Sequence, residues 1–405
     1  MPFIAKNLDV FGLDLSDRSI KVAQLKRNKN KVDLYSYART DVPQDLIVDG
    51  EIKNEEEVIR LIKKTLEDGK PNQIRSKFVV YSIPETKGFI RVIRIPKIEG
   101  DNLDETIKFE AEQLFPLNIA ESYTDWQVLP SSNDKTLDVL VAAVPMQLVD
   151  SYSSMLKNAG LTLVAAEIES IAISRSLINE KQSSRPILII DLGKDRTSFI
   201  IYKNPAVQFT ASIPVCGNEF NKAISEALHL SDNDAEKLKR VCGLSMNRKN
   251  VELTKTIKVK VNADPADGNR SGKETFGTLN LGGKAIQIGK TDDEEKASGD
   301  CNGVYKAIHP LLHEMTKYIS RLSDYYKEHY KEDSDIAKVI ICGGEARMLG
   351  ISSYLSLKIK KEVEKGNPWV NIIPASEKEI PPISRDDSLI FATVLGLAIR
   401  GINEL

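Results

Sequence analysis

Two aspartates stand at the ends of predicted strands, each at the start of a short polar turn. Asp14 closes the apolar run that begins at Val10, and Asp191 closes the run that begins at Ile187. A turn after a strand can present backbone N–H groups to a polyphosphate, and its carboxylate can hold Mg²⁺, usually through water. One such aspartate would more often simply begin a turn. Two in similar settings predict a phosphate and metal site built from both turns.

The strands around these turns form a divergent internal duplication. Small or polar residues follow both aspartates, and the two copies read Leu-Asp-Leu-Ser and Ile-Asp-Leu-Gly. The alternating pattern predicts matching strands in the two copies: Val10–Leu15, Ile20–Leu25 and Val32–Tyr37 in the first, and Ile187–Leu192, Thr197–Tyr202 and Val207–Ile213 in the second. The repeat is longer than the roughly 20–50 residues of a solenoid. The sequence therefore predicts two pseudo-equivalent lobes.

Two further motifs could contact a ligand between such lobes. An apolar strand ends in Gly343-Gly344, where the absence of a Cβ lets the backbone approach a ligand closely. On a predicted helix over Asp232–Cys242, Glu236 and Lys239 are three residues apart and share a face. They could bind ribose hydroxyls, although an exposed ion pair is the simpler explanation of that pair alone.

The order of these motifs resembles that of the actin-like ATPase superfamily, which includes actin, sugar kinases, heat-shock chaperones and the division protein FtsA. Within this superfamily the sequence is most similar to the PilM-type proteins of type IV pilus assembly. That similarity rests on Phe11–Leu25, Lys108–Pro116 and Asp125–Val128, together with the motifs above. It covers about residues 8–245 and 305–400.

The resemblance implies a cleft that binds ATP with Mg²⁺, the metal lying near Asp14 and Asp191. It implies that the following residues contact the nucleotide: Ser16, Asp17, Arg18, Ser19, Lys21, Gly193, Lys194, Thr197, Glu236, Lys239, Gly343, Gly344 and Arg347. Glu169, at a predicted helix start, is a candidate for positioning the attacking water, although a surface carboxylate is the simpler interpretation. The family's first turn usually reads Asp-x-Gly, and Ser16 replaces that glycine. We therefore expect binding more firmly than turnover.

The predicted fold class is α/β, with the actin-like arrangement of two duplicated lobes and an inserted β-α-β-β subdomain. The expected parts are a first lobe core (1–85, 146–182 and 386–405), an inserted subdomain (86–145), a second lobe core (183–214 and 336–385), and a second-lobe subdomain (215–335) with a β-hairpin insertion at 251–302. Helices are also expected at Asn54–Leu66 and Leu311–Tyr330, the latter starting after Pro310.

The inserted block at 86–145 is the expected docking site for a partner. In PilM-like proteins this block and its cleft bind the N-terminal cytoplasmic peptide of an inner-membrane PilN-type protein. Phe109, Leu114, Phe115 and Trp126 could line an apolar groove for an extended peptide. Taken one at a time, each of these side chains is better interpreted as part of a small core.

Composition restricts the remaining possibilities. The chain has 56 Lys and Arg against 58 Asp and Glu, a net charge of −2, which excludes a general nucleic-acid binder. The four cysteines show no metal or redox spacing and are typical of free thiols in a reducing compartment. No apolar run approaches the roughly 20 residues of a membrane span. We expect a cytoplasmic protein that reaches the inner membrane only through a partner, in contact with other pilus platform components and with weak self-association.

Two alternatives share the predicted fold. A small-molecule kinase would need a catalytic base beside a substrate pocket, and the sequence offers no convincing one. An FtsA-like division protein would usually end in a linker and an amphipathic helix, whereas this chain ends at Leu405, directly after its closing helix. The PilM-like scaffold is therefore the preferred hypothesis, with any ATP hydrolysis slow.

Overall fold

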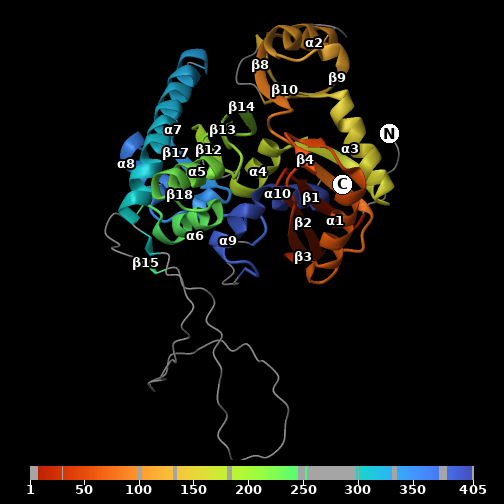
Figure 1. The fold of residues 1–405 in the computed structure, drawn as a ribbon. Coiled ribbons are helices and arrows are strands. Elements are labelled where there is room, and N and C mark those ends of the chain that lie inside the picture. Colours follow the sequence, from red (N-terminus) through yellow and green to blue (C-terminus); the bar gives the residue numbers. More distant parts are fainter. Residues whose placement is uncertain are drawn as a thin grey trace, which may run out of the picture.

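Two large β-sheets form the centre of the structure, a computed structural model that describes residues 8–29, 31–97, 103–130, 135–179, 185–244, 251–252, 298–299, 301–330, 335–373 and 381–403 (Figure 1). The first sheet has the order β11-β7-β1-β2-β3-β6 and the second the order β18-β17-β12-β13-β14-β8-β10-β9. The strands of the first sheet are β1 (Val10–Leu15), β2 (Ser19–Asn28), β3 (Lys31–Asp41), β6 (Lys70–Pro71), β7 (Phe78–Ile83) and β11 (Thr162–Ile168). Those of the second are β8 (Phe89–Pro96), β9 (Ser122–Val128), β10 (Thr136–Pro145), β12 (Ile187–Leu192), β13 (Thr197–Lys203), β14 (Ala206–Ile213), β17 (Lys338–Cys342) and β18 (Val363–Lys365).

The two sheets repeat one strand pattern. In the first, β1 lies parallel to β7 and antiparallel to β2. In the second, β12 lies parallel to β17 and antiparallel to β13. Each central strand thus ends at a hairpin turn, and the predicted duplication into two lobes is confirmed.

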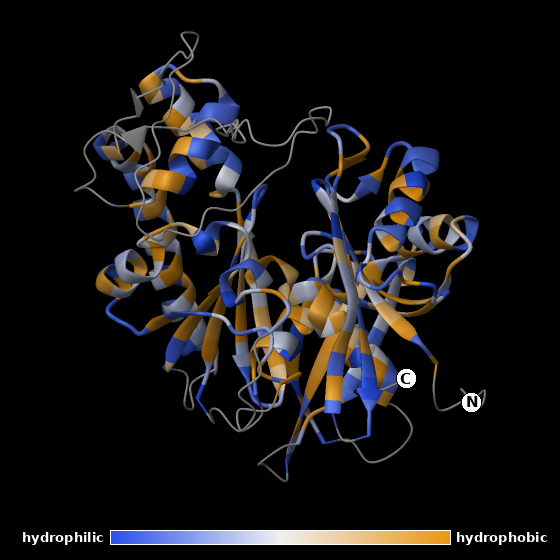
Figure 2. Ribbon diagram, turned by 90° about the horizontal axis from the view of Figure 1, so that it is seen from below, coloured by the Kyte–Doolittle hydropathy of each residue, from blue (hydrophilic) through white to orange (hydrophobic). Residues whose placement is uncertain are grey.

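Helices cover the sheets and lie between the lobes (Figure 1). They are α1 (Glu55–Glu67), α2 (Leu103–Leu114), α3 (Met146–Asn158), α4 (Glu169–Leu177), α5 (Gly217–Leu228), α6 (Asp232–Cys242), α7 (Cys301–Tyr330), α8 (Ile351–Ile359), α9 (Arg385–Ser388) and α10 (Ala392–Asn403). Short 3₁₀ turns are η1 (Ile119–Glu121), η2 (Glu345–Arg347) and η3 (Leu389–Phe391), and two small ladders pair β4 (Ile47–Val48) with β5 (Glu51–Ile52) and β15 (Val251–Glu252) with β16 (Ser298–Gly299). The central strands are mostly apolar, whereas the outer helices alternate between apolar and polar residues (Figure 2).

The local sequence explains where α1 begins. The side chain of Asn54 accepts a hydrogen bond from the backbone N–H of Glu57 at 3.2 Å, which satisfies a donor in the first turn. Val58, Leu61 and Ile62 then form a buried face at helical spacing. The helix predicted from Asn54 is therefore confirmed, with its stop one residue later.

The inserted block extends the second sheet. Its strands β8, β10 and β9 are antiparallel, and β8 joins β14 through the pair Phe209 and Arg91. Helix α2 covers one face and buries Phe115. The prediction that Phe109, Leu114 and Trp126 belong to a small core is wrong, because they are 60%, 41% and 37% exposed. A single short helix is too small to cover three strands completely. Apolar side chains of α2 and β9 therefore stay exposed to solvent.

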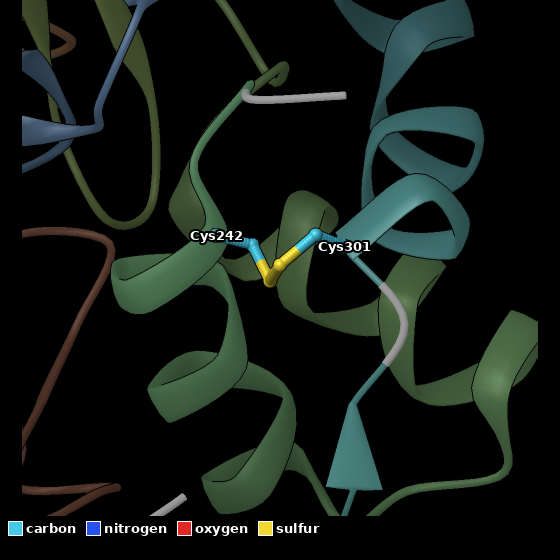
Figure 3. Close-up of a disulfide and its surroundings, with 2 residues drawn as sticks. All are labelled: Cys242 and Cys301. Atoms are coloured by element: carbon cyan, nitrogen blue, oxygen red, sulfur yellow. A yellow bond between two sulfur atoms is a disulfide. The ribbon is translucent and has the colours of Figure 1, made fainter. Parts of the chain in front are cut away.

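A disulfide joins the end of α6 to the start of α7. Cys242 and Cys301 are both fully buried and are bonded to each other (Figure 3). The prediction of four free thiols is wrong for this pair, whereas Cys216 and Cys342 are free and buried. The separation of 59 residues between Cys242 and Cys301 gives no signal in the sequence, because only the packing of α6 against α7 brings these two residues together.

Two other predictions concern the neighbouring segment. Helix α7 begins at Cys301 rather than after Pro310, which lies inside the helix. The buried side chains Val304, Ile308 and Leu312 continue one face through the proline, so packing compensates for the hydrogen bond that proline cannot donate. The hairpin predicted within 251–302 lies outside the described residues, apart from the short pair β15 and β16. Among the described residues, no helix is both long enough and apolar enough to span a membrane.

Helix α10 packs so closely against its neighbours that glycine is required at the contacts. A Cβ on Gly396 would lie 1.8 Å from the carbonyl oxygen of Ala172 in α4. A Cβ on Gly12 in β1 would lie 2.6 Å from the carbonyl oxygen of Val394. These two glycines set the distance from α10 to the sheet and to α4.

We expect Gly396→Ala to lower the free energy of unfolding by about 1–3 kcal/mol, because the added methyl group must push α10 away from α4. Asn403→Ala, at the exposed end of the same helix, should change it by at most about 0.5 kcal/mol. Urea unfolding of the two variants tests this, and equal stability of Gly396→Ala and the wild-type protein would contradict the close contact.

Candidate functional site

A cavity of about 460 Å³ lies between the two lobes. Its volume is in the range of small-molecule pockets, roughly 300–1,000 Å³. The turn between β1 and β2 lines it from the first lobe, and the turn between β12 and β13 lines it from the second. The loop after β17 and the start of α10 complete the lining.

The two turns have the same geometry. The backbone N–H of Ser16 donates to the carbonyl of Ser19 at 3.0 Å, and that of Gly193 donates to the carbonyl of Arg196 at 3.0 Å. A Cβ on Gly193 would lie 2.6 Å from the carbonyl oxygen of Arg196, so this turn requires glycine. Ser16 stands at the equivalent position of the first turn, where its hydroxyl donates to the Ser19 carbonyl at 3.1 Å.

Asp14 and Asp191 lie at the floor of the cleft. Asp14 is buried and accepts hydrogen bonds from Lys21 at 2.8 Å and from Ser82 at 3.1 Å. Burial, followed by the charge of Glu169, raises the pKa of Asp191 to about 6, although Arg196 opposes the shift. Asp191 therefore ionises only above mildly acidic pH, whereas Asp14 has an ammonium partner.

The Gly343 turn contributes the space around Asp191. Gly343 has a φ of +86°, and a Cβ there would lie 2.3 Å from Oδ1 of Asp191. Gly344 follows with an open surface, since nothing lies within 4 Å of its would-be Cβ. Gly343 therefore leaves the space that the Asp191 carboxylate occupies, and both glycines form part of the cavity wall.

A buried ion cluster forms the second-lobe wall. The ammonium of Lys239, which is 1% exposed, lies 2.8 Å from Glu345 and 3.0 Å from Glu236 and also donates to the carbonyl of Gly217. Although burial opposes it, Lys239 and Arg240 lower the pKa of Glu236 to about 2. Burial raises the pKa of Glu345, and Lys239 limits that rise. The pair predicted as a ligand contact is thus part of a three-residue cluster.

Glu169 reaches the cleft from the start of α4. Its Oε2 accepts hydrogen bonds from Arg196 at 2.7 Å and from the backbone N–H of Glu85 at 3.0 Å. The carboxylate is therefore held across the two lobes by a guanidinium. Its role in positioning a water stays a prediction.

The structure brings together most of the predicted site residues. Those that line the cavity are Asp14, Ser16, Asp17, Arg18, Ser19, Lys21, Glu169, Asp191, Gly193, Lys194, Glu236, Lys239, Gly343, Gly344 and Arg347. Thr197 is fully buried outside this lining, and its hydroxyl donates to the carbonyl of Val215 at 2.6 Å. Asp17 lines the cavity, but its carboxylate accepts the N–H groups of Asp49 and Gly50 at 2.9 Å and so holds a neighbouring loop.

Other lining residues were missed by the sequence analysis: Arg39, Arg240, Glu345, Met348, Asp386, Leu389, Ile390, Ala392 and Thr393. Asp195 and Arg196 also line the cavity, as expected for residues inside the predicted second turn. Glu345 directly follows the glycine pair, so its place in the sequence could have predicted its place in the cavity wall. The segment from Asp386 to Thr393 gave no such signal, because only the return of the chain to the first lobe brings it to the cleft.

The residues at the floor fit a magnesium ion bound together with phosphates. Mg²⁺ in such sites uses one or two carboxylates and keeps several waters. Asp14 and Asp191 supply two carboxylates from opposite lobes, each just before a turn that lines the cavity. Within the described ranges, no three His, Cys, Asp or Glu side chains are grouped closely enough to hold a metal by themselves.

Comparisons with known proteins agree with this architecture. A solved structure described as the PilM-PilN type IV pilus biogenesis complex matches with a TM-score of 0.72 and 20% identity, over 98% of this chain and 99% of that chain. MreB5 of Spiroplasma citri bound to AMPPNP matches with a TM-score of 0.54 and 13% identity, over 96% and 95%. The cell division protein FtsA of Pseudomonas aeruginosa is 22% identical over 268 residues, which are 66% of this chain and 54% of FtsA. The chain thus spans about half the length of this relative.

Two family models match the sequence. The model of cell division protein FtsA matches residues 188–396, which contain the second lobe. The model of type IV pilus assembly protein PilM matches residues 12–255, which contain the inserted block and both turns that line the cavity. With the full-length structural match, these findings confirm the actin-like α/β fold. The chain belongs to the PilM family of type IV pilus assembly proteins.

Proposed function

We propose that this protein is an ATP-binding scaffold of type IV pilus assembly, which docks the cytoplasmic tail of an inner-membrane PilN-type protein. The observation that carries the nucleotide half is the pairing of Asp14 and Asp191 beneath two equivalent turns. The observation that carries the docking half is the exposed apolar surface of the inserted block. The two sites lie in different parts of the fold.

The cleft supplies complementary groups for each part of Mg-ATP. The two turns that line the cavity, with Lys21 and Lys194, are placed where the phosphates would lie. Asp14 and Asp191 would hold the magnesium ion, which when bound neutralises phosphate charge. The wall near Glu236 and the glycine pair would hold the nucleoside. That a structural match was solved with AMPPNP supports nucleotide binding by the fold.

Binding without rapid turnover suits the geometry best. A general base must approach the attacking water freely, and Glu169 is the nearest candidate. Its Oε2 is already engaged by Arg196 and by a backbone N–H. ATP would then act as a ligand that stabilises one arrangement of the lobes, with hydrolysis slow.

The inserted block offers a surface for an extended peptide. Its outer strand β9 is the last strand of the second sheet, so one row of its backbone groups is unpaired in that sheet. Tyr123 and Trp126 on β9 and Phe109 on α2 are exposed, and a cavity of about 230 Å³ lies beside Trp126. An added strand would pair with the free edge of β9, and its apolar side chains would contact the exposed aromatic residues and the cavity. A PilN-type cytoplasmic tail is the proposed occupant.

This function places the protein at the cytoplasmic face of the inner membrane through its partner. Other components of the pilus platform, and a second copy of the chain bound weakly, are further proposed partners. An FtsA-like role is the second candidate, since the FtsA model also matches residues 188–396. A small-molecule kinase of the same fold is less suited, because the candidate base is engaged by Arg196.

We expect Asp191→Asn to weaken Mg-ATP binding without unfolding the protein. The folded-state pKa of Asp191 lies above its ordinary value, so the ionised carboxyl costs stability above about pH 6, and the amide removes that cost. Calorimetric titration should detect at least a tenfold loss of Mg-ATP affinity. Asp45→Asn, on an exposed loop of the first lobe, is the control and should bind like wild type. Unchanged affinity in Asp191→Asn would contradict the cleft assignment.

We also expect Mg-ATP affinity to fall as the pH drops below about 6. A protonated Asp191 cannot bind the metal, so the loss should approach about tenfold per pH unit well below its pKa. Titrations at pH 5.0, 6.0 and 7.5 measure this slope. Asp191→Asn controls for protonation of the nucleotide itself, and identical slopes in variant and wild type would exclude Asp191 as the titrating group.

A synthetic peptide of the partner's N-terminal tail should protect backbone amides of β9 and α2 from hydrogen exchange. Phe109→Ala and Trp126→Ala should each weaken the peptide at least about tenfold, since exposed aromatic side chains anchor interfaces. Leu357→Ala is the matched control, because Leu357 is 76% exposed but lies on α8, which packs beside β18 at the opposite end of the second sheet from β9. Protection confined to other elements would place the docking surface elsewhere.

A further inference from the structure

An ion pair between side chains joins the two turns that line the cavity, residues 16–19 and 193–196. Arg18 of the first turn donates from Nε to both carboxylate oxygens of Asp195 in the second, at 3.1 and 3.3 Å. The two residues are 177 apart in sequence, the same offset that relates Asp14 to Asp191. Arg18 and Asp195 therefore occupy equivalent positions of the duplication. They meet because the turns face each other, and they have diverged to opposite charges.

The backbones of both turns are fixed independently of this ion pair. The carbonyl of Arg18 accepts the N–H of Val42 at 2.9 Å, and that of Lys194 accepts the N–H of Asn218 at 2.8 Å. The carboxylate of Asp195 has a second donor, since the Asn218 side chain bonds to it at 2.6 Å. Breaking the pair therefore requires movement of the Arg18 side chain only, and Asp195 stays hydrogen-bonded.

A second ion pair between the lobes, Arg196 with Glu169, is more buried than the pair between Arg18 and Asp195. Arg196 binds Glu169 at 2.7 Å with side chains 26% and 11% exposed. The charge of Glu169, together with the other carboxylates nearby, raises the pKa of Arg196, although burial opposes the shift. Arg18 and Asp195 are 31% and 32% exposed, so water competes for both and their pair is weak. Of the two bridges, the pair between Arg18 and Asp195 is the one a ligand can exchange.

A phosphate is the ligand that would exchange it. The terminal phosphate of a nucleotide carries a charge of about −1.5 to −2 and three acceptor oxygens, against one charge on a carboxylate. Guanidinium groups bind phosphate with two parallel hydrogen bonds. Arg18 already lines the cavity between the two turns, where the proposed function places the phosphates.

We propose that Arg18 and Asp195 form an exchangeable latch, in which Arg18 leaves Asp195 for the terminal phosphate of bound ATP. This proposal rests on the nucleotide site described under the proposed function. Arg18 then determines the preference for ATP over ADP, since it gains its strongest partner only when the third phosphate is present. Asp195 competes with that phosphate and holds the lobes together when the cleft is empty.

The latch predicts opposite effects for two changes that break the same ion pair. Asp195→Asn weakens the competitor and should raise Mg-ATP affinity by up to about fivefold, the limit for a partly exposed pair. Arg18→Gln removes the phosphate ligand and should lower Mg-ATP affinity by about tenfold or more, with a smaller loss for Mg-ADP. Calorimetric titration of the full chain with both nucleotides measures these changes. Lys53→Gln, which breaks an exposed pair with Glu51 inside the first lobe, should change neither affinity.

The nucleotide-free protein provides a second readout. Both Asp195→Asn and Arg18→Gln should let the two lobes move further apart, because either change removes a bridge between them. Small-angle X-ray scattering should then give a larger radius of gyration for each nucleotide-free variant than for the wild-type protein. Equal losses of ATP affinity in the two variants, or no change in either, would show the pair to be structural and overturn the latch. Wild-type protein that fails to bind Mg-ATP would overturn the proposed nucleotide site, and the latch with it; wild-type binding with any other variant pattern overturns the latch alone.

Discussion

The crossing of α10 over α4 is the constraint on which the geometry of the cleft depends. Gly396 brings the two helices to backbone contact, and Gly12 brings α10 equally close to β1. The buried carboxylate of Glu167 accepts hydrogen bonds from Arg175 of α4 and Arg400 of α10, which locks the crossing. Since Asp14 ends β1 and Glu169 begins α4, this packing fixes the distance between two acidic groups of the cleft. The last helix of the chain thereby positions residues from its beginning and its middle.

Because the two lobes are duplicated, the cleft is lined by two equivalent turns. Because the copies have diverged, the two turns carry different charges. Both copies keep the aspartate at the end of the central strand and the hydrogen bond that closes the turn. Where the copies differ, their side chains become complementary, as in Arg18 and Asp195. A symmetrical pair of turns would present the same charge from both sides. Opposite charges instead allow an ion pair to bridge the cleft, as between Arg18 and Asp195.

Much of the fold could be predicted from the sequence because its signals are local. The alternating strands, the capped helix at Asn54 and the polar turns after two aspartates each depend on a few adjacent residues. Interactions between distant segments were not predictable in this way. The disulfide between Cys242 and Cys301, the continuation of α7 through Pro310 and the return of the chain at Asp386 depend on packing that no short window contains. The prediction that the aromatic residues of the inserted block form a core was wrong for another reason. The same amphipathic sequence pattern is compatible with a buried core and with an exposed docking face.

The inserted block is connected to both lobes, and this links the two proposed sites. Its first strand β8 follows directly from the first-lobe segment at Glu85, whose backbone N–H binds Glu169 at the cleft floor. The same strand pairs with β14 of the second lobe at Phe209, where Arg91 also donates to the hydroxyl of Tyr325 in α7. Because the block is attached to both lobes, any movement of one lobe relative to the other would change the contacts of the block with at least one of them. If the cleft binds nucleotide and the block binds a peptide, any change that one ligand makes in the other's affinity must therefore be reciprocal. If both proposed sites are occupied in this way, the connection through β8 would let the occupancy of the cleft affect the binding of the peptide, with no need for nucleotide hydrolysis.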